Sequence, residues 1–452
     1  MRLGILASHP IQYQAPWFRA LAKQVDLDVF FASRPDAAEQ GAGFGKSFTW
    51  DVDLLSGYRH VFLENKSENP SVNHFFGCDT PEIAEIIRAG GQPPARQSGY
   101  GGGARSEVRG QIEFDAFIVT GWSLKSYWQA IRACRRQGIP VLVRGDSQLH
   151  TPRSSPGRAL KQLTHRLALR QFDGFLSVGR RNREYLLHYG VPAEKIFRVP
   201  HFVDNERFAR QADAIRGQRS EIRSQWRIPE DAFCVLFCGK SIPKKRPMDL
   251  VKAAESLVTR HSSLKVHLLF AGSGELGAQL RANCNVVFDA ETNQRSAVTG
   301  QKSQNREPIR QRTDSPWRRT DNQKPHASFA GFLNQTEIAR AYVAADVLVL
   351  PSDGHETWGL AVNEAMACGL PAIVSDAVGC APDLIEEGKT GFTFPFGNSE
   401  QLARQLETIA ELKQRGHDFG PALASKLQDY SIETAVGGTM EAIEIVVHHA
   451  KR

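Results

Sequence analysis

The sequence predicts an α/β protein with two domains, each built on a parallel β-sheet that helices cover on its faces. Three observations lead to this prediction. The chain has 452 residues, more than a single hydrophobic core usually organises. Short apolar runs alternate with amphipathic runs along most of its length. The strand pattern also stops near Asp204 to Arg216 and restarts at Phe233, which places a domain boundary there.

The strand-like runs are short, mostly apolar and rich in β-branched or aromatic residues. The clearest are Arg2–Ala7, Leu27–Ala32, Phe117–Thr120, Val141–Arg144, Gly174–Val178, Lys195–Val199, Phe233–Cys238, Val266–Ala271, Asn285–Phe288, Val347–Leu350 and Ala372–Ser375. Helices are predicted between them at Trp17–Gln24, Ser123–Gln137, Arg158–Gln171, Arg180–His188, Pro247–His261, Gln335–Ala344, Thr357–Ala367 and Ser399–Leu412. Ligands of such sheets lie beyond the carboxyl ends of the strands, so we expect a site in a cleft between two facing domains.

The predicted first domain covers residues 1–205 and the second covers 206–431, with a C-terminal helix at about 432–452 packing back onto the first. Two segments, 90–112 and 291–326, are poor in aliphatic residues and rich in Gly, Pro, Gln, Asn, Ser and Arg. This composition is typical of disordered insertions. Solvated loops are favoured for both over a role in binding lipid or an acidic partner.

Charge and composition exclude several classes of function. The insertions carry six of the seven excess positive charges, so the rest of the chain is nearly neutral and offers no basic face for nucleic acid. No segment approaches the roughly 20 apolar residues of a membrane span, and the first residues predict a strand rather than a signal peptide. Seven cysteines without a pairing pattern favour a reducing cytosol.

The most informative segment runs from Val347 to Gly369, where a strand, a polar glycine-bearing loop and a helix follow one another. Backbone N–H groups at the start of a helix favour an anion. The segment also holds Glu356 and Glu364. Two carboxylates beside an anion site make sense when the ligand also carries hydroxyls, as a nucleotide sugar does.

The eight-residue spacing of Glu356 and Glu364 argues against a hydrolase. On a continuous helix they would be about 12 Å apart along the axis, whereas paired glycosidase carboxylates are roughly 5–9.5 Å apart. Separate roles fit better, although Glu364 taken by itself is better explained as an exposed helical glutamate.

Two further loops follow predicted strands in the second half. Gly239 to Arg246 carries four cations, and lysines there would neutralise a diphosphate without a metal; a solvated basic loop is the alternative. The two glycines of Gly272-Ser273-Gly274 permit a tight turn and a close approach of the backbone to a ligand. An ordinary strand-to-helix turn explains them about as well.

Taken together, these segments resemble family-4 retaining glycosyltransferases, which have the GT-B fold of two Rossmann-like domains facing across a cleft. The Glu-x7-Glu motif in its Pro-Ser…Gly-Leu…Glu-Ala-Met-Ala-x-Gly-x-Pro frame lies between Pro351 and Pro371. The family's Gly-Arg…Lys-Gly loop corresponds to Gly239-Lys240…Lys245-Arg246, with Lys240 and Arg246 in place of the usual Arg and Gly. Both replacements keep a positive charge.

The resemblance implies a role for each matching residue. Glu356 would act at the reaction centre by binding donor-sugar hydroxyls, and Glu364 would hold the ribose. Lys240 and Lys245 would neutralise the diphosphate. The remaining donor-site residues it implies are Gly272, Phe332, in the segment whose backbone reads the nucleobase, and Thr357, Trp358, Gly359 and Leu360.

The first half carries weaker signals. His9-Pro10-Ile11-Gln12-Tyr13 resembles a sequence in bacterial transferases of exported polysaccharide assembly, which makes His9, Gln12 and Tyr13 acceptor-side candidates; helix-start packing explains them equally well. Trp122 is also an acceptor-side candidate that could stack on a sugar, but core packing is the favoured explanation of this residue. Where relatives place a cleft histidine, this chain has Arg144-Gly145-Asp146-Ser147, so Arg144, Asp146, Ser147 and the nearby His150 stay open as replacements, Asp146 being our catalytic candidate.

The sequence therefore predicts an enzyme that transfers a hexosyl group from a UDP- or GDP-sugar to a saccharide or lipid-linked acceptor with retention. We expect no cofactor and no metal, a role in polysaccharide or glycoconjugate biosynthesis, and a cytoplasmic location; peripheral contact with the inner face of the membrane is left open. The alternative is a catalytically inactive GT-B scaffold that binds nucleotide sugar within a polysaccharide assembly complex.

Overall fold

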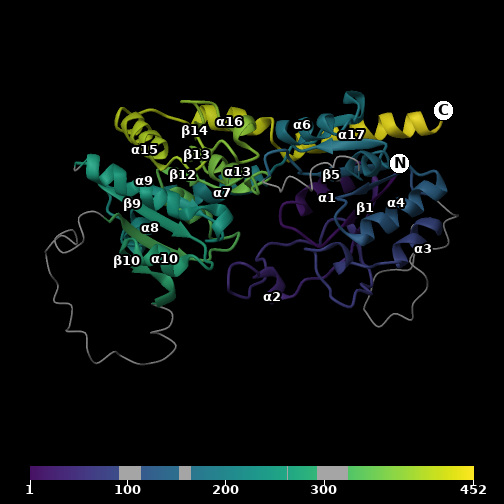
Figure 1. Cartoon of the computed structure of the whole chain (residues 1–452), viewed down its shortest axis with the longest axis horizontal. Coiled ribbons are helices and arrows are strands. Elements are labelled where there is room, and N and C mark those ends of the chain that lie inside the picture. Colours follow the sequence, from purple (N-terminus) through teal and green to yellow (C-terminus); the bar gives the residue numbers. More distant parts are fainter. Residues whose placement is uncertain (91–112, 152–163, 262, 293–323) are drawn as a thin grey trace. The chain divides into compact units, whose positions relative to one another are not determined.

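The computed structural model describes residues 1–90, 113–151, 164–261, 263–292 and 324–452, which form two compact units (Figure 1). The first unit comprises Met1–Asp36, Val52–Asp204 and Asp429–Arg452, and the second comprises Ala37–Asp51 and Asn205–Gln428. Each unit holds one seven-stranded sheet in which all paired strands are parallel. The predicted α/β class and the two parallel sheets are confirmed.

The sheet of the first unit has the strand order β3-β2-β1-β4-β5-β6-β7. Its strands are β1 (Arg2–Ala7), β2 (Asp26–Phe31), β3 (Arg59–Phe62), β4 (Ala116–Val119), β5 (Val141–Gly145), β6 (Gly174–Ser177) and β7 (Ile196–Arg198). Its helices are α1 (Ala15–Ala22), α3 (Glu82–Arg88), α4 (Lys125–Gln137), α6 (Arg180–His188) and α17 (Ile432–Ala450), with short 3-10 turns η1 (Phe75–Gly77) and η2 (Ala193–Lys195).

The side chains of alternate residues in the central strands pack into two separate hydrophobic cores in this unit. Leu6 of β1 joins α3, α4 and α6 in one core. Its neighbour Ile5 joins α1 and α17 in the other. Because successive side chains of a strand point to opposite faces, helices cover both faces of the sheet, which is the doubly wound arrangement.

The sheet of the second unit has the order β10-β11-β9-β8-β12-β13-β14. Its strands are β8 (Phe233–Cys238), β9 (Val266–Ala271), β10 (Asn285–Asp289), β11 (His326–Gly331), β12 (Val347–Leu350), β13 (Ala372–Ser375) and β14 (Gly391–Phe394). Its helices are α2 (Ala37–Gln40), α7 (Asn205–Arg216), α8 (Arg219–Gln225), α9 (Pro247–Arg260), α10 (Gly277–Ala282), α12 (Ala339–Ala344), α13 (Leu360–Ala367), α14 (Ala381–Leu384), α15 (Ser399–Gln414) and α16 (Gly420–Gln428), with the 3-10 turn η3 (Pro243–Lys245).

Local sequence explains why several of these elements begin and end where they do. All six residues of β8 are buried, as expected for a central parallel strand with helices on both faces. Helix α15 begins after Asn398, whose side chain accepts a hydrogen bond from Gln401 N at 2.9 Å. Helix α4 ends at Gly138, which adopts the left-handed conformation that favours glycine.

The units differ from the predicted domains in one important respect. The first unit ends its main part at Asp204, and the C-terminal helix α17 packs against α1 within that unit. Residues 37–51, however, were predicted in the first domain and belong to the second unit. The reason is a set of contacts with strand ends of the second sheet, described below, which sequence order does not reveal.

Most of both predicted insertions lies outside the described residues. At the described end of the second one the prediction is wrong, because His326 is buried and begins β11. That strand is the second from one edge of the sheet, where it pairs with β10 on one side and β9 on the other. The insertion therefore ends earlier than its composition indicated.

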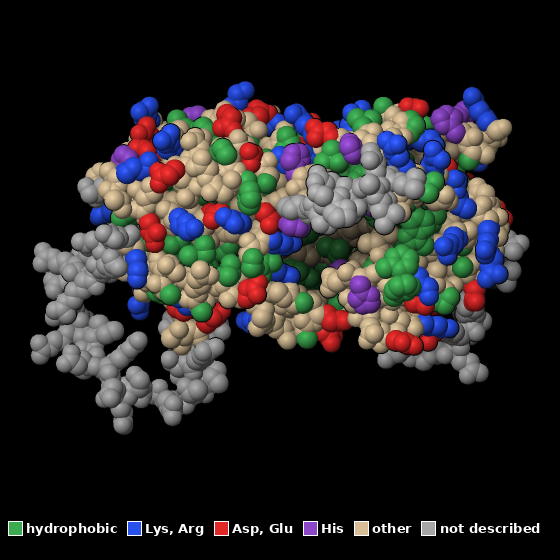
Figure 2. Space-filling view, in the orientation of Figure 1, with side chains coloured by type: hydrophobic (Ala, Val, Ile, Leu, Met, Phe, Trp, Pro, Cys, Tyr) green, Lys and Arg blue, Asp and Glu red, His purple; other side chains and the backbone are tan. Residues whose placement is uncertain are grey.

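The surface shows no dominant sign of charge on the face drawn in Figure 2, where Lys and Arg side chains alternate with Asp and Glu over both units. This agrees with the near-neutral composition outside the insertions. Among the described helices, none combines the length and apolar character needed to cross a membrane.

A buried charge cluster joins α8 to the sheet of the second unit. Arg223, with a side chain only 1% exposed, donates to Asp346 Oδ2 at 3.0 Å, and Arg219 and Lys413 also pair with that carboxylate. Burial alone would raise the pKa of Asp346, but Lys413, the Cys234 N–H and the arginines hold it below its ordinary value. The carboxylate thus stabilises the fold above about pH 3.8, and this contribution is lost as the pH falls through the lowered folded pKa.

We expect Asp346→Ala to destabilise the second unit by about 3–5 kcal/mol, because it leaves the buried Arg223 without its carboxylate partner. Urea unfolding followed by circular dichroism measures the change. Glu411→Ala, which removes an exposed ion pair with Arg415, is the matched control and should cost less than about 1 kcal/mol. Equal stability of the two variants would show that the cluster is not what holds α8 in place.

Candidate functional site

The loops that follow β8, β9 and β11 are hydrogen-bonded to one another at the carboxyl ends of these strands. Gly272 N donates to Gly331 O at 2.7 Å, and Ser241 N donates to Ser273 O at 2.9 Å. Gly272 has a φ of 131°, and a Cβ there would lie 2.0 Å from the Gly239 carbonyl oxygen. Only glycine permits this approach, so Gly272 holds the loops together as a continuous rim where ligands of such sheets bind.

Lys240 lies on this rim, directly after β8. Its Nζ donates to the Ala42 carbonyl and lies 4.9 Å from the centre of the Phe44 ring. Burial, and then the positive charges of Lys244 and Lys245, lower the pKa of Lys240 below its ordinary value. The side chain therefore offers a partly desolvated cation, which strengthens its interaction with an anion.

Lys245 and Glu356 form an ion pair that links the loop after β8 to the loop after β12. Their side chains are only 16% and 15% exposed. The two loops are also joined by Asp353 N, which donates to Lys244 O at 2.9 Å. The structure thus brings together two residues that are 111 positions apart in the sequence and that the sequence assigned to one site.

The amides of Thr357 to Leu360 lie at the start of α13. Gly359 precedes the helix with a φ of 102°, and a Cβ there would lie 2.6 Å from Leu350. Trp358, predicted to bind the donor, has its side chain 3% exposed and donates from Nε1 to Asn363 Oδ1 at 2.8 Å. Its ring is therefore part of the packing under the loop, and only its backbone remains a candidate for ligand contact.

The alternative raised above, that Glu364 is an exposed helical glutamate, is wrong, because the residue is buried. It is 3% exposed and accepts a hydrogen bond of 2.5 Å from Tyr342 Oη, which also lies 3.4 Å from Cys238 Sγ at the end of β8. Burial and then the neighbouring Cys238 and Glu364 raise the pKa of Tyr342 well above its ordinary value, so the phenol stays a donor. The contact of Glu364 with a ribose stays a prediction, and Tyr342 is a hydrogen-bond partner of Glu364 that sequence reasoning missed.

Phe332 follows β11 and contacts residues 37–51, which we call the aromatic segment. Its ring centre lies 5.0 Å from that of Phe44 and 4.1 Å from that of Phe48. Sequence reasoning did not assign the aromatic segment to this site. A signal was present, because Phe44, Phe48 and Trp50 interrupt an otherwise polar, glycine-rich stretch.

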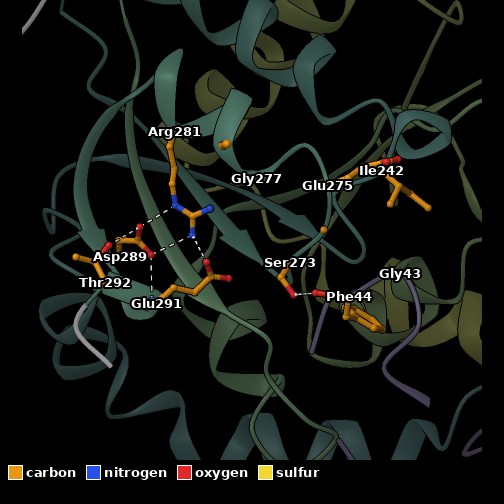
Figure 3. A pocket seen from close by; sticks show the side chains of 13 residues that line it. Gly43, Phe44, Ile242, Ser273, Glu275, Gly277, Arg281, Asp289, Glu291 and Thr292 are labelled. Atoms are coloured by element: carbon orange, nitrogen blue, oxygen red, sulfur yellow. Dashed lines mark hydrogen bonds and ion pairs between the residues drawn. The ribbon is translucent and has the colours of Figure 1, made fainter. Parts of the chain in front are cut away.

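A cavity of about 800 Å³ opens beside this rim in the second unit. Figure 3 shows Phe44, Ser273 and Glu275 along one part of it and an Arg281 cluster at the other. Arg281 donates to Asp289 at 2.7 and 3.1 Å and to Glu291 at 3.0 Å. Volumes of this size suit a small-molecule ligand.

The first-half candidates all lie in the other unit. His9, Gln12 and Tyr13 are half-buried in the turn between β1 and α1, and His9 Nδ1 lies 3.0 Å from Ser8 Oγ. Trp122 packs against His165 and Phe172, and its carbonyl accepts from Trp128 Nε1 at 2.8 Å. Packing of the Trp122 ring, the alternative raised above, is what the structure shows.

Asp146 is exposed directly after β5, whereas Arg144 in the same strand is buried. Arg144 donates to the Pro200 carbonyl at 3.3 Å and lies over the rings of Trp17 and Phe202. Burial lowers its pKa to about 10, an effect that the Asp146 charge opposes. Of these two candidates, Asp146 is the one that a ligand in solution can reach.

No group of three or more His, Cys, Asp or Glu side chains suited to a metal ion occurs within the described parts of the chain.

Two family models match the sequence. The model described as glycosyltransferase family 4 matches residues 17–207, and that described as glycosyl transferases group 1 matches residues 317–425. The second match contains Glu356 and Glu364, and it begins after the loops that carry Lys240 and Gly272.

Curated relatives match over part of their length. A D-inositol 3-phosphate glycosyltransferase of Streptomyces scabiei is 26% identical over 283 residues, which cover 60% of this chain and 53% of that protein. A sulfoquinovosyl transferase of Arabidopsis thaliana is 38% identical over 112 residues, which cover 24% of this chain and 22% of that protein. The chain thus spans about half or less of the relatives it matches.

Solved structures share the fold over nearly the whole chain. HepE of Anabaena in complex with UDP has a TM-score of 0.59 at 16% identity and covers 98% of this chain and 100% of its own. A glycosyltransferase of Rickettsia africae has a TM-score of 0.62 at 14% identity, with 98% of each chain covered. The shared fold is the GT-B fold, and the two family models, which match residues 17–207 and 317–425, support a family-4-like glycosyltransferase.

Proposed function

We propose that this protein is a retaining glycosyltransferase that moves a hexosyl group from a nucleoside-diphosphate sugar to a saccharide or lipid-linked acceptor. The observation that carries the proposal is the Lys245–Glu356 ion pair beside Lys240, at the carboxyl ends of the adjacent strands β8 and β12. It offers cations for a diphosphate and a carboxylate for sugar hydroxyls on one rim of the sheet.

The chemical difficulty of this reaction is the charge that develops on the departing diphosphate. Lys240, Lys245 and the backbone amides of Thr357 to Leu360 would stabilise that charge as the bond to the sugar breaks, in the role that a metal ion has elsewhere. Glu356 would accept hydrogen bonds from the sugar hydroxyls and hold the anomeric carbon in place. Retention rests on the family resemblance, with the acceptor hydroxyl attacking from the face that the diphosphate leaves.

The donor is best sought among UDP-sugars, because HepE of Anabaena has been solved with UDP and with UDP-glucose; GDP-sugars are the next class. The acceptor class and a role in polysaccharide assembly rest on the resemblance of His9 to Tyr13. The cytoplasmic location that we propose rests on the seven cysteines, which show no pairing pattern. Asp146 is the first-unit side chain that we propose for the reaction centre.

A screen of UDP- and GDP-sugars by thermal shift, in buffer with EDTA, tests the proposal. We expect one nucleotide class to raise the melting temperature and the matching sugar to be released slowly as free sugar in the absence of acceptor. A lack of binding to every nucleotide would contradict the donor site. Binding with no turnover for any acceptor would instead favour a non-catalytic scaffold.

The lowered pKa of Lys240 gives this site an expected pH dependence. The protonated side chain is the form that binds a diphosphate, so UDP affinity should fall as the pH rises through a pKa below the ordinary 10.5. Lys240→Arg keeps its charge at all these pH values and should hold its affinity to higher pH. Isothermal titrations from about pH 7 to 10 compare the two proteins; identical pH profiles would mean that Lys240 does not contact the diphosphate.

A further inference from the structure

The aromatic segment, residues 37–51, comes from the first half of the chain but is attached to the second unit. At its end, the Asp51 carboxylate accepts hydrogen bonds from Thr336 N at 3.1 Å and from Thr336 Oγ1. Asn334 Nδ2 donates to the Thr49 carbonyl at 2.8 Å. These contacts fix the segment to the loop that follows β11.

The middle of the segment is bonded to the two other loops of the rim. Ser273 Oγ, after β9, donates to the Phe44 carbonyl at 2.6 Å (Figure 3). Lys240 Nζ, after β8, donates to the Ala42 carbonyl. The backbone of the aromatic segment therefore meets the ends of three strands of the second sheet, including the strand end that carries Lys240.

The Phe44 ring lies between two groups with assigned roles at opposite ends of the nucleotide. Its centre is 4.9 Å from Lys240 Nζ and 5.0 Å from the centre of the Phe332 ring. Under the proposed function, Lys240 binds the diphosphate and the backbone near Phe332 reads the base. The nucleoside joins these two parts, so it must pass beside Phe44.

The surroundings of Phe44 leave room for such a ligand. The ring is only half-buried, and it lines the cavity of about 800 Å³. Gly43 and Gly45 flank it with φ values of 82° and 67°, and a Cβ on Gly43 would lie 3.0 Å from the Lys240 side chain. The glycines thus let the backbone approach the rim closely while the ring stands at the edge of the cavity.

We propose that Phe44 stacks on the nucleobase of the donor and that the aromatic segment forms one wall of the nucleoside site. The inference rests on the proposed function and adds a binding residue from the half of the chain otherwise assigned to the acceptor. Stacking on an aromatic side chain suits any base, since every base has a π-face.

The test compares the affinity of wild type and Phe44→Ala for two probes by isothermal titration. The first probe is UDP or GDP, whichever wild type binds more tightly, and the second is inorganic pyrophosphate, which has no base. We expect Phe44→Ala to bind the nucleotide about tenfold more weakly and pyrophosphate within about twofold of wild type. Phe44→Trp should restore nucleotide affinity.

Phe76→Ala is the matched control, because Phe76 is 67% exposed and belongs to the first unit; it should bind both probes as wild type does. Unchanged or tighter nucleotide binding by Phe44→Ala would overturn the inference. Tighter binding would mean that the Phe44 ring blocks the site instead of stacking on the base. An equal loss of affinity for the nucleotide and for pyrophosphate would also overturn the inference, because it would mean that the substitution disturbs Lys240 rather than a contact with the base. If the wild-type protein bound neither UDP nor GDP, that result would instead contradict the proposed function itself.

If Phe44→Ala melts well below wild type, Asp51→Asn provides an independent measurement. It keeps the size of the side chain and weakens the anchor on Thr336. We expect weaker nucleotide binding with pyrophosphate binding retained. Wild-type affinity for the nucleotide in this variant would show that attachment of the segment does not matter to the site.

Discussion

Replacing Glu356 with alanine should lower the rate of sugar transfer by about 100- to 1000-fold, as loss of a preorganised polar group at a reaction centre does elsewhere. The side chain is 15% exposed, and its carboxylate is paired with Lys245. Its removal takes away the acceptor of hydrogen bonds from the donor sugar and leaves a partly buried cation without a partner. The rate of sugar transfer is measured as the release of nucleoside diphosphate from the preferred donor in the presence of acceptor.

Two variants separate this effect from a general loss of structure. Glu356→Gln keeps the size of the side chain and loses its charge, so it should fall between wild type and Glu356→Ala. Glu411→Ala, on the exposed side of α15, should leave the rate unchanged. If the folded Glu356→Ala variant turned over at a near-normal rate, Glu356 would not act at the reaction centre.

Replacing Lys245 with alanine is expected to weaken nucleoside-diphosphate binding by about tenfold or more. Its side chain is 16% exposed, so its interaction with a phosphate is screened less than that of a surface lysine. An interaction of about 1.4 kcal/mol corresponds to tenfold in affinity. Isothermal titration with UDP or GDP measures the change, and Lys389→Ala, with a side chain 71% exposed, is the control.

The two replacements should differ in kind. Lys245→Ala should weaken binding of the nucleoside diphosphate itself, whereas Glu356→Ala should leave that affinity within a few-fold, because Glu356 is assigned to the sugar. If both variants lost nucleotide affinity equally, the ion pair would be a structural support for the loop rather than two residues with separate ligands.

The sequence predicted the buried strands well. The bounds expected for β8, β9, β12 and β13 are those observed, because a strand covered on both faces is a continuous apolar run that ends at turn residues. The grouping of Lys240, Lys245 and Glu356 at one edge of the sheet could also be predicted, because parallel strands bring their carboxyl ends together.

The elements that sequence reasoning missed have weaker patterns. β3 contains Arg59 and His60 and is an edge strand, so its residues do not form an apolar run. β11 reads His-Ala-Ser-Phe-Ala-Gly, whose small and polar residues resemble the insertion before it, although all six are buried. Burial of these residues depends on neighbours from distant parts of the chain.

The placement of Glu364 and of the aromatic segment was beyond sequence reasoning for the same reason. Glu364 is buried, and its carboxylate accepts a hydrogen bond from Tyr342, 22 residues earlier. Phe44 reaches Ser273 across 229 positions. The aromatic residues of the segment indicate that it packs against other parts of the chain, but no local pattern identifies these partners, which follow from the way the loops meet at the strand ends.

The central claim is that the rim carrying Lys240, Lys245 and Glu356 binds a nucleotide sugar and breaks its bond to the diphosphate. The most direct measurement is release of UDP or GDP from a panel of nucleotide sugars by wild type, Glu356→Ala and Lys245→Ala, with EDTA present. We predict release from at least one donor by wild type and a strong reduction in both variants. Release at the same rate by all three proteins, or its loss from wild type on adding EDTA, would contradict the account.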